Sequence, residues 1–492
     1  MQSISEQHQV YWQSLGNTRL FPTPGHRNFT TTLSIGEIKF KMELAMSAVA
    51  GELLSRFISF LSNKYHSSQA YSEDKQLEKL QLLLLRACTV VEEADGRYIT
   101  NSGMLAQLKM LASAMYRGYW ALGAASYRSL EEDSTLEVEV SNSSVCPKRS
   151  RAVHANARKN QARPYDAYLY MENFMFGRHT EKQLLSKFLL QHDHRSPPAV
   201  LPIIGALGVG KKTLVAHVCN DERVRSRFPV ILHLRESDLL TMTDHSTLVA
   251  EKTTLLIIEF VSDLGEKDWS RFYSALASLD SRSKVVILSR YKNSEKFGTV
   301  KPIFLNPLSY EEFSYLFKTL TFGSANQLEY PRLVRIADEF ARELQSDWSL
   351  VTANLLADVI RRDLNVCFWL CILTRLRRVV ERNLSMFGEH PKLLLERGHE
   401  IAVTDLVLHS SCPLRLVWGI TDDVPMKKKP SKVTFHELLI DPGAGRKVES
   451  GQLTWESRLP PYTSFHHFVS PCAQGMLGGT TLSRRKRRGV PF

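Results

Sequence analysis

A short glycine-rich segment of this chain has the composition and spacing of a phosphate-binding turn. Gly205, Gly208 and Gly210 lead directly to Lys211, after an apolar run typical of a buried strand and before residues spaced as one helix face. Glycines let backbone N–H groups curl around an anion, and a helix N-terminus favours negative charge. A lysine at this spacing reaches the β- and γ-phosphates. The segment therefore predicts a site for a phosphate-bearing ligand.

The residue after Lys211 departs from the full pattern, in which a Ser or Thr hydroxyl ligates Mg²⁺. Here that residue is Lys212, and the nearest hydroxyl belongs to Thr213, one position later. An ammonium group cannot ligate a cation. Lys212 and Thr213 remain candidate phosphate contacts, but the pattern favours phosphate binding over metal-assisted hydrolysis. We therefore expect no catalytic residue and no enzymatic activity beyond a residual ATPase.

The elements needed to position this turn are those of an α/β domain between residues 167 and 322. Short apolar runs alternate with helical or polar stretches, which predicts a parallel sheet with crossover helices. Ligands of such sheets bind at the carboxyl ends of the strands, where the turn falls. The expected strands are Val200–Ile204, Val230–Leu234, Leu255–Ile258, Lys284–Leu288 and Pro302–Leu305.

The remainder of the chain divides by composition and periodicity. Apolar residues at three- and four-residue spacing predict an N-terminal four-helix bundle, and a second helical region follows the α/β domain. Polar or basic stretches without a sustained period predict unfolded segments. The expected order is a disordered leader (1–41), the bundle (42–128), a linker (129–166), the α/β domain (167–322), a helical subdomain (323–399) and an irregular basic tail (400–492). Met42 is an alternative start of translation.

Charge and cysteine usage narrow the class of protein. The net charge of +12 is concentrated in basic runs such as 427–429 and 484–488, which solvation, nuclear import or a polyanion contact would each explain. Without aromatic residues between them, they make a nucleic-acid partner the weakest alternative. The seven cysteines lack metal-ligand spacing, and Cys367 and Cys371 lie in an apolar helical run that suggests buried thiols. We expect a protein without a membrane span, located in the cytoplasm or also in the nucleus.

Five segments, taken in order, resemble the plant NB-ARC disease-resistance proteins of the coiled-coil (Rx-N) type. The start of the bundle is similar to the first helix of their N-terminal domain. An FGR element, the glycine-rich turn, a strand ending in Arg and the segment after that strand match the corresponding family motifs. These segments are 42–53, 175–181, 205–211, 284–290 and 305–317. The resemblance implies ADP or ATP as ligand, a function in defence signalling, and partners among other resistance-type proteins, pathogen effectors or guarded host proteins.

The same resemblance implies roles for individual residues. Gly177 and Arg178 would lie over the adenine, and Arg290 would sense the γ-phosphate. In the family a strand ends in two Asp residues, whereas here it ends in Glu259 and Phe260. Glu259 is the one candidate metal-binding residue, reaching Mg²⁺ through water. Phe260 cannot position or activate a water molecule.

Other family features are missing or altered. The Gly-Leu-Pro-Leu motif has no clear match, although residues 347–350 stand where it is expected. The Met-His-Asp motif and leucine-rich repeats are absent from the sequence given. Two hypotheses follow: a nucleotide switch with little or no turnover, or a scaffold, decoy or helper that binds no nucleotide and pairs with resistance proteins through its bundle.

Overall fold

The structure is a computed structural model, and it describes most of the chain from residue 35 onward. The chain divides into two compact units, Met1–Ala45 and Met46–Phe492, and every element after helix α2 belongs to the second. The described residues are 35–64, 73–99, 101–131, 176–191, 198–236, 253–260, 272–274, 276, 279–323, 325, 327–406, 414–418, 431–440, 451–456 and 464–471.

A five-stranded parallel sheet occupies the middle of the chain, in the order β2-β3-β4-β1-β5. Each of the five predicted strands is present, so the expected α/β fold is confirmed. The apolar residues of β1, β3 and β4 are buried on both faces, as continuous hydrophobic runs in parallel sheets require, whereas those of the edge strand β2 are half-buried. The strands are β1 (Ala199–Gly205), β2 (Val230–Arg235), β3 (Thr254–Phe260), β4 (Lys284–Ser289) and β5 (Ile303–Leu305).

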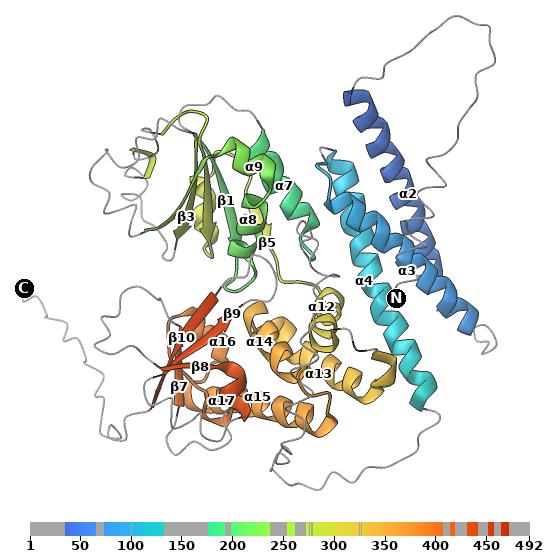
Figure 1. Cartoon of the computed structure of the whole chain (residues 1–492), viewed down its shortest axis with the longest axis vertical. Helices are drawn as coiled ribbons and strands as arrows, with labels where there is room; N and C mark the ends of the chain where they lie inside the picture. The colour runs from blue at the N-terminus through green and yellow to red at the C-terminus, as the bar shows by residue number, and fades with distance from the viewer. Residues whose placement is uncertain are drawn as a thin grey trace, which may run out of the picture. The chain divides into compact units, whose positions relative to one another are not determined.

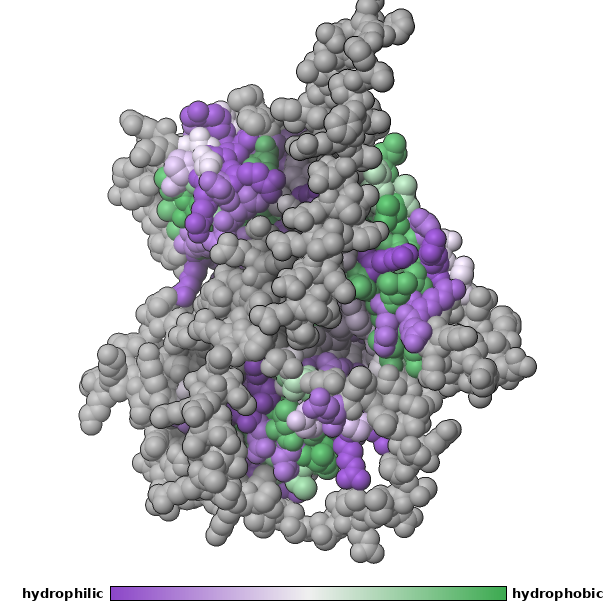
Figure 2. Space-filling view, turned by 45° about the vertical axis from the view of Figure 1, so that its right-hand side comes forward, coloured by the Kyte–Doolittle hydropathy of each residue, from purple (hydrophilic) through white to green (hydrophobic). Residues whose placement is uncertain are grey.

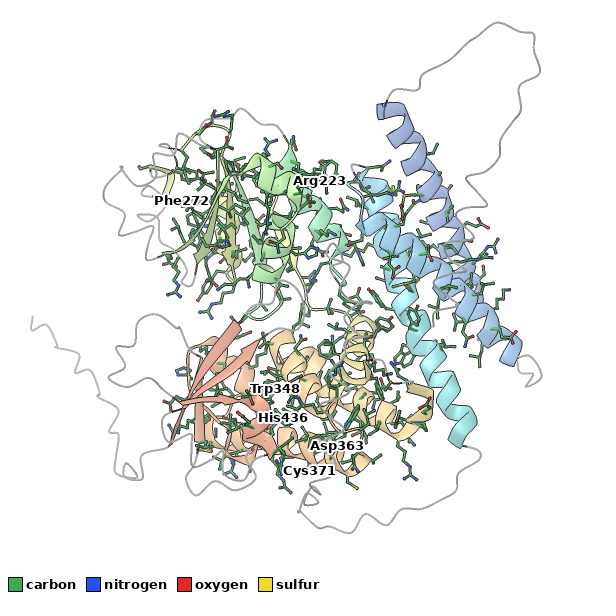
Figure 3. The ribbon with its side chains drawn as sticks, in the orientation of Figure 1. Arg223, Phe272, Trp348, Asp363, Cys371 and His436 are labelled. Atoms are coloured by element: carbon green, nitrogen blue, oxygen red, sulfur yellow. The ribbon has the colours of Figure 1, made fainter. Side chains whose placement is uncertain are left out.

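Helices cover one face of this sheet, as Figure 1 shows. They are α7 (His179–Leu190), α8 (Lys211–Cys219) and α9 (Glu222–Arg227). Because successive strand residues point to opposite faces, Leu255 and Ile257 of β3 pack with these helices. Leu256, Ile258 and Phe260 pack on the other face, against a separate cluster that includes Phe272 and Phe297. In Figure 3, Phe272 and Arg223 of α9 lie on opposite sides of the sheet.

Three helices of the predicted four-helix bundle are described: α2 (Ile35–Lys64), α3 (Glu73–Asp95) and α4 (Ser102–Glu131). Their buried faces share one core. Helix α2 starts at Ile35, so the prediction of a disordered leader through residue 41 was wrong for its last residues. Residues 1–34, and residues 132–166 of the predicted linker, lie outside the described residues.

A helical region follows the sheet. Ser309 caps α12 through a capping box with Glu312, Asn365 caps α15, and Gly388, in a left-handed conformation, ends it. The elements are α12 (Tyr310–Phe322), η3 (Gln327–Glu329), α13 (Pro331–Asp347), α14 (Leu350–Ile360), α15 (Val366–Phe387) and α16 (Pro391–Glu396); the short helix η2 (Lys292–Phe297) belongs to the sheet domain, between β4 and β5.

The prediction of an irregular tail after residue 400 was wrong for its described parts. A second five-stranded sheet, ordered β6-β7-β10-β9-β8, forms there; its pairs are antiparallel except β8 with β9. The elements are β6 (Ile401–Ala402), η4 (Thr404–Leu406), β7 (Leu414–Trp418), β8 (Ser431–Thr434), α17 (Phe435–Ile440), β9 (Gly451–Glu456) and β10 (Ser464–Pro471).

Two polar side chains of α15 explain why this C-terminal part is ordered. Fully buried Asn383 donates to the carbonyl of Ala402 and accepts from its N–H, each over 2.8 Å. Buried Arg375 donates to the carbonyls of Leu406 (3.3 Å) and Leu439 (3.0 Å). These partners are distant in sequence, and the strands after residue 400 are short, so local periodicity did not predict those strands. The helical region and the described C-terminal residues therefore share one core.

Two further expectations concern cysteines and membranes. Cys367 is exposed, and Cys371 is half-buried and disulfide-bonded, so the prediction of buried thiols was wrong. The buried face of α15 runs through Trp369, Ile372 and Leu376, and both cysteines fall beside it. Among the helices in the described part of the chain, none is long and apolar enough to cross a membrane.

Candidate functional site

The glycine-rich turn joins β1 to α8 at the carboxyl edge of the parallel sheet. Gly208 and Gly210 have φ angles of 70° and 98°, a left-handed conformation that glycine adopts without steric cost. The turn leads into the nine-residue helix α8, whose first N–H groups have no partner within the helix. The local backbone therefore has the form of an anion-binding cradle.

Lys211 lies across this cradle. Its Nζ donates to the carbonyl oxygens of Gly205 (2.6 Å) and Ala206 (2.9 Å), so the side chain folds back over the turn. Burial lowers the pKa of Lys211 to about 8, although Glu259 and Glu396 act in the opposite direction. A desolvated ammonium group that donates to carbonyl oxygens is a ready partner for a phosphate group.

Lys212 points to β3 and forms an ion pair with Glu259, with 2.7 Å between Nζ and Oε2. Both residues were singled out from the sequence, Lys212 where a metal-ligating hydroxyl is expected and Glu259 as the candidate metal ligand. The structure brings them together. Thr213 lies in the first turn of α8, half-buried. The carboxylate is thus already matched by an ammonium group, and this donor set does not fit a divalent cation.

Phe260 occupies the position of the second acidic residue and points away from the turn. Its side chain is 2% exposed, and its ring packs edge-on against Phe272 and Phe297, with centroids 6.0 and 5.1 Å away. Strand alternation places Glu259 on the face of α8 and Phe260 on the opposite face. No carboxylate at residue 260 could approach the turn from there without a change in β3.

The FGR element contacts the turn directly. Buried Arg178 donates from Nη2 to the carbonyl of Val209 over 3.3 Å. Burial also lowers the pKa of Arg178. Gly177 has a φ of 64°, and a Cβ there would lie 2.8 Å from Leu308. Arg178 therefore lies at the turn, whereas Gly177 packs against Leu308, just before α12.

Arg290, predicted to sense the γ-phosphate, contacts the helical region. Its Nη1 donates to the carbonyl of Glu396 in α16. Its Nη2 donates to the hydroxyl of Tyr291 over 2.6 Å. The guanidinium group is exposed at the end of β4. It contacts the helical region through Glu396, and its charge is also among the influences that lower the pKa of Lys211 at the turn, after burial.

The start of α14 covers the other side of the turn. A Cβ on Gly208 would lie 2.3 Å from the Cβ of Ser349, and the N–H of Leu350 donates to the Gly208 carbonyl over 3.2 Å. This is the segment that stands where Gly-Leu-Pro-Leu is expected. A cavity of about 80 Å³ begins beside it, lined by Leu207, Ser349, Glu396 and mainly apolar residues of α14, α15 and β6.

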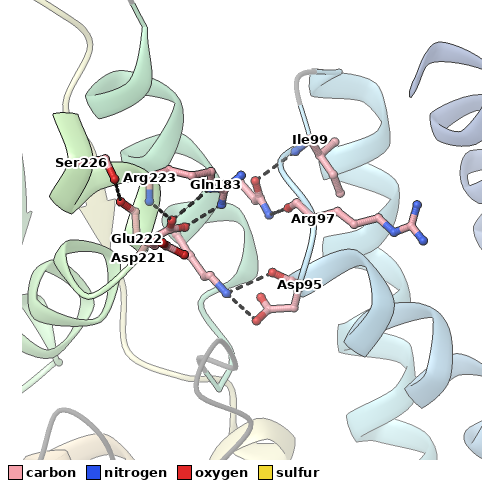
Figure 4. A network of polar contacts seen from close by, with 9 residues as sticks. Asp95, Arg97, Ile99, Gln183, Asp221, Glu222, Arg223 and Ser226 are labelled. Carbon is pink, nitrogen blue, oxygen red and sulfur yellow. Dashed lines mark hydrogen bonds and ion pairs between the residues drawn. The ribbon is translucent and has the colours of Figure 1, made fainter. Parts of the chain in front are cut away.

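A second polar cluster joins the bundle to α7, as Figure 4 shows. Asp95 binds Lys182 through Oδ2 (2.7 Å) and His179 through Oδ1 (2.9 Å). Gln183 accepts from the N–H of Ile99 over 3.2 Å and donates to the carbonyl of Arg97. We call Asp95, His179, Lys182 and Gln183 the junction cluster. Its three α7 residues follow Arg178 closely in the sequence, so the junction cluster lies near the FGR element that contacts the turn.

Aromatic rings extend this contact to α12. Tyr116 of α4 packs against Phe176 (5.0 Å between centroids) and Tyr315 (5.4 Å), and Tyr119 packs against Tyr315 (4.7 Å). Sequence inspection identified neither this cluster nor the junction cluster. The available signal was indirect, since Asp95 ends a helix and Lys182 and Gln183 sit among the apolar residues of another.

A five-stranded parallel sheet in this order, with helices and a glycine-rich turn at its carboxyl edge, defines a P-loop NTPase-like α/β domain. No protein-family model matches the chain. The relatives found among characterised proteins are plant disease-resistance proteins of the NB-ARC type, at low identity and with partial coverage.

Two relatives illustrate the extent of the match. The chain is 26% identical over 197 residues to disease resistance protein RGA2 of Solanum bulbocastanum, covering 34% of this chain and 20% of that protein. It is 21% identical over 343 residues to putative disease resistance protein RGA4 of the same species, covering 59% and 34%. The matched part is thus at most about a third of these relatives' length.

Solved structures were also compared. Drosophila ORC bound to DNA gives a TM-score of 0.31 at 12% identity, covering 54% of this chain and 75% of that chain. Domain III of the replication initiation protein DnaA from Thermotoga maritima gives a TM-score of 0.25 at 13% identity, covering 47% and 94%.

Proposed function

We propose that this chain binds ADP or ATP at the glycine-rich turn, acts in plant defence, and turns over little or no nucleotide. Gly205, Gly208, Gly210 and Lys211 would hold the phosphates, with Lys212 and Thr213 at the first turn of α8. The observation that carries the proposal is the cradle itself: two left-handed glycines, a helix N-terminus and a desolvated lysine at one sheet edge. Similarity to NB-ARC relatives supports its use for a nucleotide.

The expectation of little turnover depends on two side chains. Phe260 is buried among other rings, and Glu259 is paired with Lys212. A hydrolytic site needs a group to position the attacking water and a site for the metal ion that neutralises developing charge. The described residues at this edge supply the phosphate cradle without either of these.

Arg178 and Arg290 would then have unequal roles. Arg178 already supports the turn through Val209, consistent with a place beside the bound nucleotide. Arg290 donates from Nη1 to the Glu396 carbonyl of α16, and a guanidinium group has five N–H donors. Under this proposal Arg290 links a bound γ-phosphate to the contact between the helical region and the sheet.

Nucleotide content of the natively purified full chain tests the proposal. The protein is denatured, and the supernatant is resolved by chromatography. We expect near-stoichiometric ADP or ATP in the wild-type protein and none in Lys211→Ala, because Lys211 is the cation at the cradle. A folded wild-type protein that is empty and fails to bind added nucleotide would overturn the proposal.

A second candidate function, a scaffold or helper that pairs with other resistance-type proteins, is favoured by the surface of the bundle. In Figure 2 hydrophobic residues form a strip on the helical bundle, at the right of the view. Several large apolar side chains of the bundle helices are about half exposed, and such residues are typical of interaction surfaces where they are contiguous. They include Val49 (45%), Ile58 (54%), Leu82 (50%), Leu85 (48%), Met110 (52%) and Trp120 (42%).

Co-precipitation of the full chain with co-expressed resistance-type proteins tests this candidate. The variant Leu82→Asp/Leu85→Asp should lose partners that the wild-type protein recovers. Leu393→Asp is the matched control, because Leu393 is similarly exposed (44%) but lies in α16. Equal recovery by all three proteins would contradict pairing through the bundle. As part of the same proposal, the protein works in the cytoplasm or nucleus, which fluorescent tagging in plant cells would test.

A further inference from the structure

The ion pair between Lys212 and Glu259 joins the two positions that a P-loop protein uses for its metal ion. Lys212 follows the cradle lysine, where a hydroxyl ligand is expected, and Glu259 ends β3. Their charged atoms are 2.7 Å apart, with 66% and 36% of the side chains exposed. An ion pair this exposed adds little to stability, so its significance lies in where it is.

Strand and helix geometry together bring this ammonium to the turn. Glu259 lies on the face of β3 that α8 covers, together with Ile257. Lys212 is in the first turn of α8, adjacent to Lys211, whose Nζ crosses the cradle. The side chain of Lys212 therefore extends from the N-terminus of α8 to the Glu259 carboxylate, along the edge where a phosphate would bind.

These residues do not fit a divalent cation. Glu259 is matched by a cation of the protein, and the hydroxyl ligand is replaced by a group without a lone pair. A second cation placed here would meet Lys211 and Lys212 at short range, which is repulsive. In the described ranges, no group of three or more His, Cys, Asp or Glu residues could hold a metal ion.

We propose that the ammonium group of Lys212 replaces the metal ion, so that this chain binds the metal-free nucleotide. This inference rests on the proposed nucleotide function. Lys211 and Lys212 supply positive charge on either side of the cradle opening, and Glu259 holds Lys212 in place. The ammonium of a lysine has three N–H donors, so it can donate two hydrogen bonds to phosphate oxygens while keeping one to the carboxylate. Mg²⁺ then contributes nothing to affinity and competes with the protein for the nucleotide.

Binding of a fluorescent ADP analogue to the full chain, in excess EDTA and in millimolar Mg²⁺, tests the proposal. Wild-type affinity should be the same within about twofold in the two buffers, or tighter in EDTA. Lys212→Thr restores the missing hydroxyl and frees Glu259, so its affinity should become at least about tenfold tighter with Mg²⁺ than without. Lys212→Met, which has neither ammonium nor hydroxyl, should bind weakly in both buffers.

The outcomes distinguish the role of Lys212 from the proposed nucleotide binding on which it depends. Wild-type binding that requires Mg²⁺ would overturn the role of Lys212 and leave nucleotide binding intact. An absence of binding in both buffers, with the protein folded by circular dichroism, would overturn the proposed function itself. Loss of folding in Lys212→Thr is not expected, because the side chain is largely exposed, and the wild-type comparison decides without it.

Discussion

The glycine-rich edge of the sheet and the junction cluster are both polar, but they differ in solvent exposure. At the edge, Lys212 and Glu259 are 66% and 36% exposed. At the junction, Asp95 is 2% exposed and Lys182 11%. Breaking an exposed ion pair costs about 0–1 kcal/mol, whereas removing one partner of a buried pair costs about 3–5 kcal/mol. Residues at the edge can therefore be exchanged with little effect on folding, while those at the junction cannot.

This contrast explains how the edge could differ so much from the nucleotide-binding pattern within an intact sheet. Substituting Lys for a hydroxyl residue at position 212 disturbs no buried contact. By contrast, the junction is held by buried polar contacts: His179, Lys182 and Gln183 each have a partner in α3 or in residues 97–99. The first region can change its chemistry, and the second maintains the bundle in place against α7.

Phe260→Asp should have the largest effect on stability, because residue 260, unlike Lys212 and Glu259, is buried. The carboxylate would be buried among Phe272 and Phe297, so we expect a loss of about 5 kcal/mol in the free energy of unfolding. Phe260→Leu should lose only about 1–2 kcal/mol. Urea denaturation measures both. A Phe260→Asp protein as stable as wild type, with new ATPase activity, would show that residue 260 can reach the turn.

Asp95→Ala should cost about 3–5 kcal/mol, because it leaves Lys182 buried without its counter-ion. A variant that removes both charges, Asp95→Ala/Lys182→Met, should recover more than half of that loss. Chemical denaturation of the wild type, Asp95→Ala, Lys182→Met and the double variant gives the coupling energy. A coupling below about 1 kcal/mol would mean that the buried pair contributes no more to stability than the exposed pair at the edge. The contrast between the two regions would then not hold.

The acid stability of the wild-type protein should also depend on Asp95. Burial opposes its charged form, but hydrogen bonds and the charges of His179 and Lys182 outweigh burial and lower its pKa below 3.8. Its contribution is therefore fully present above pH 3.8 and is lost as the pH falls further. Acid denaturation of Asp95→Asn should show a shallower loss in that range. A curve parallel to the wild type would contradict this assignment.

Nucleotide affinity should decrease above the pKa of Lys211, about 8. A bound phosphate favours the charged lysine, so affinity is full below pH 8 and falls as the free protein loses this proton. Between pH 7 and pH 9 the loss should be about tenfold. Lys211→Arg stays charged and should show little change. Titrations of the fluorescent ADP analogue across this range provide the measurement, and equal slopes for the two proteins would rule out Lys211 as the titrating group.

The smallest effect is expected for the exposed pair itself. Lys212→Thr and Glu259→Gln should each change the free energy of unfolding by less than about 1 kcal/mol, with a coupling in the same range. Thermal unfolding of both variants and their combination provides the test. A coupling of several kcal/mol would mean that the exposed pair contributes as much to stability as the buried pair at the junction. The contrast between the two regions would then be wrong.

Local patterns in the sequence were sufficient for the parallel sheet and its turn. Continuous apolar runs predict strands that are buried on both faces, and a Gly-rich turn before a helix has few other structural solutions. Asn383 and Arg375 illustrate what such patterns miss, because their partners lie 19 to 64 positions away in the chain. The second sheet, for which the sequence predicted only an irregular tail, depends on contacts of this kind.

The sequence by itself determined the order of the strands along the chain, the phosphate-type turn, and the loss of the hydroxyl and second carboxylate expected of a hydrolase. Those features are set by residue type and short-range spacing. Only the tertiary structure decided that Lys212 pairs with Glu259, that Phe260 faces the opposite side of the sheet, and that Asp95 binds α7. The physical reason is that burial and charge pairing depend on which side chains meet in space.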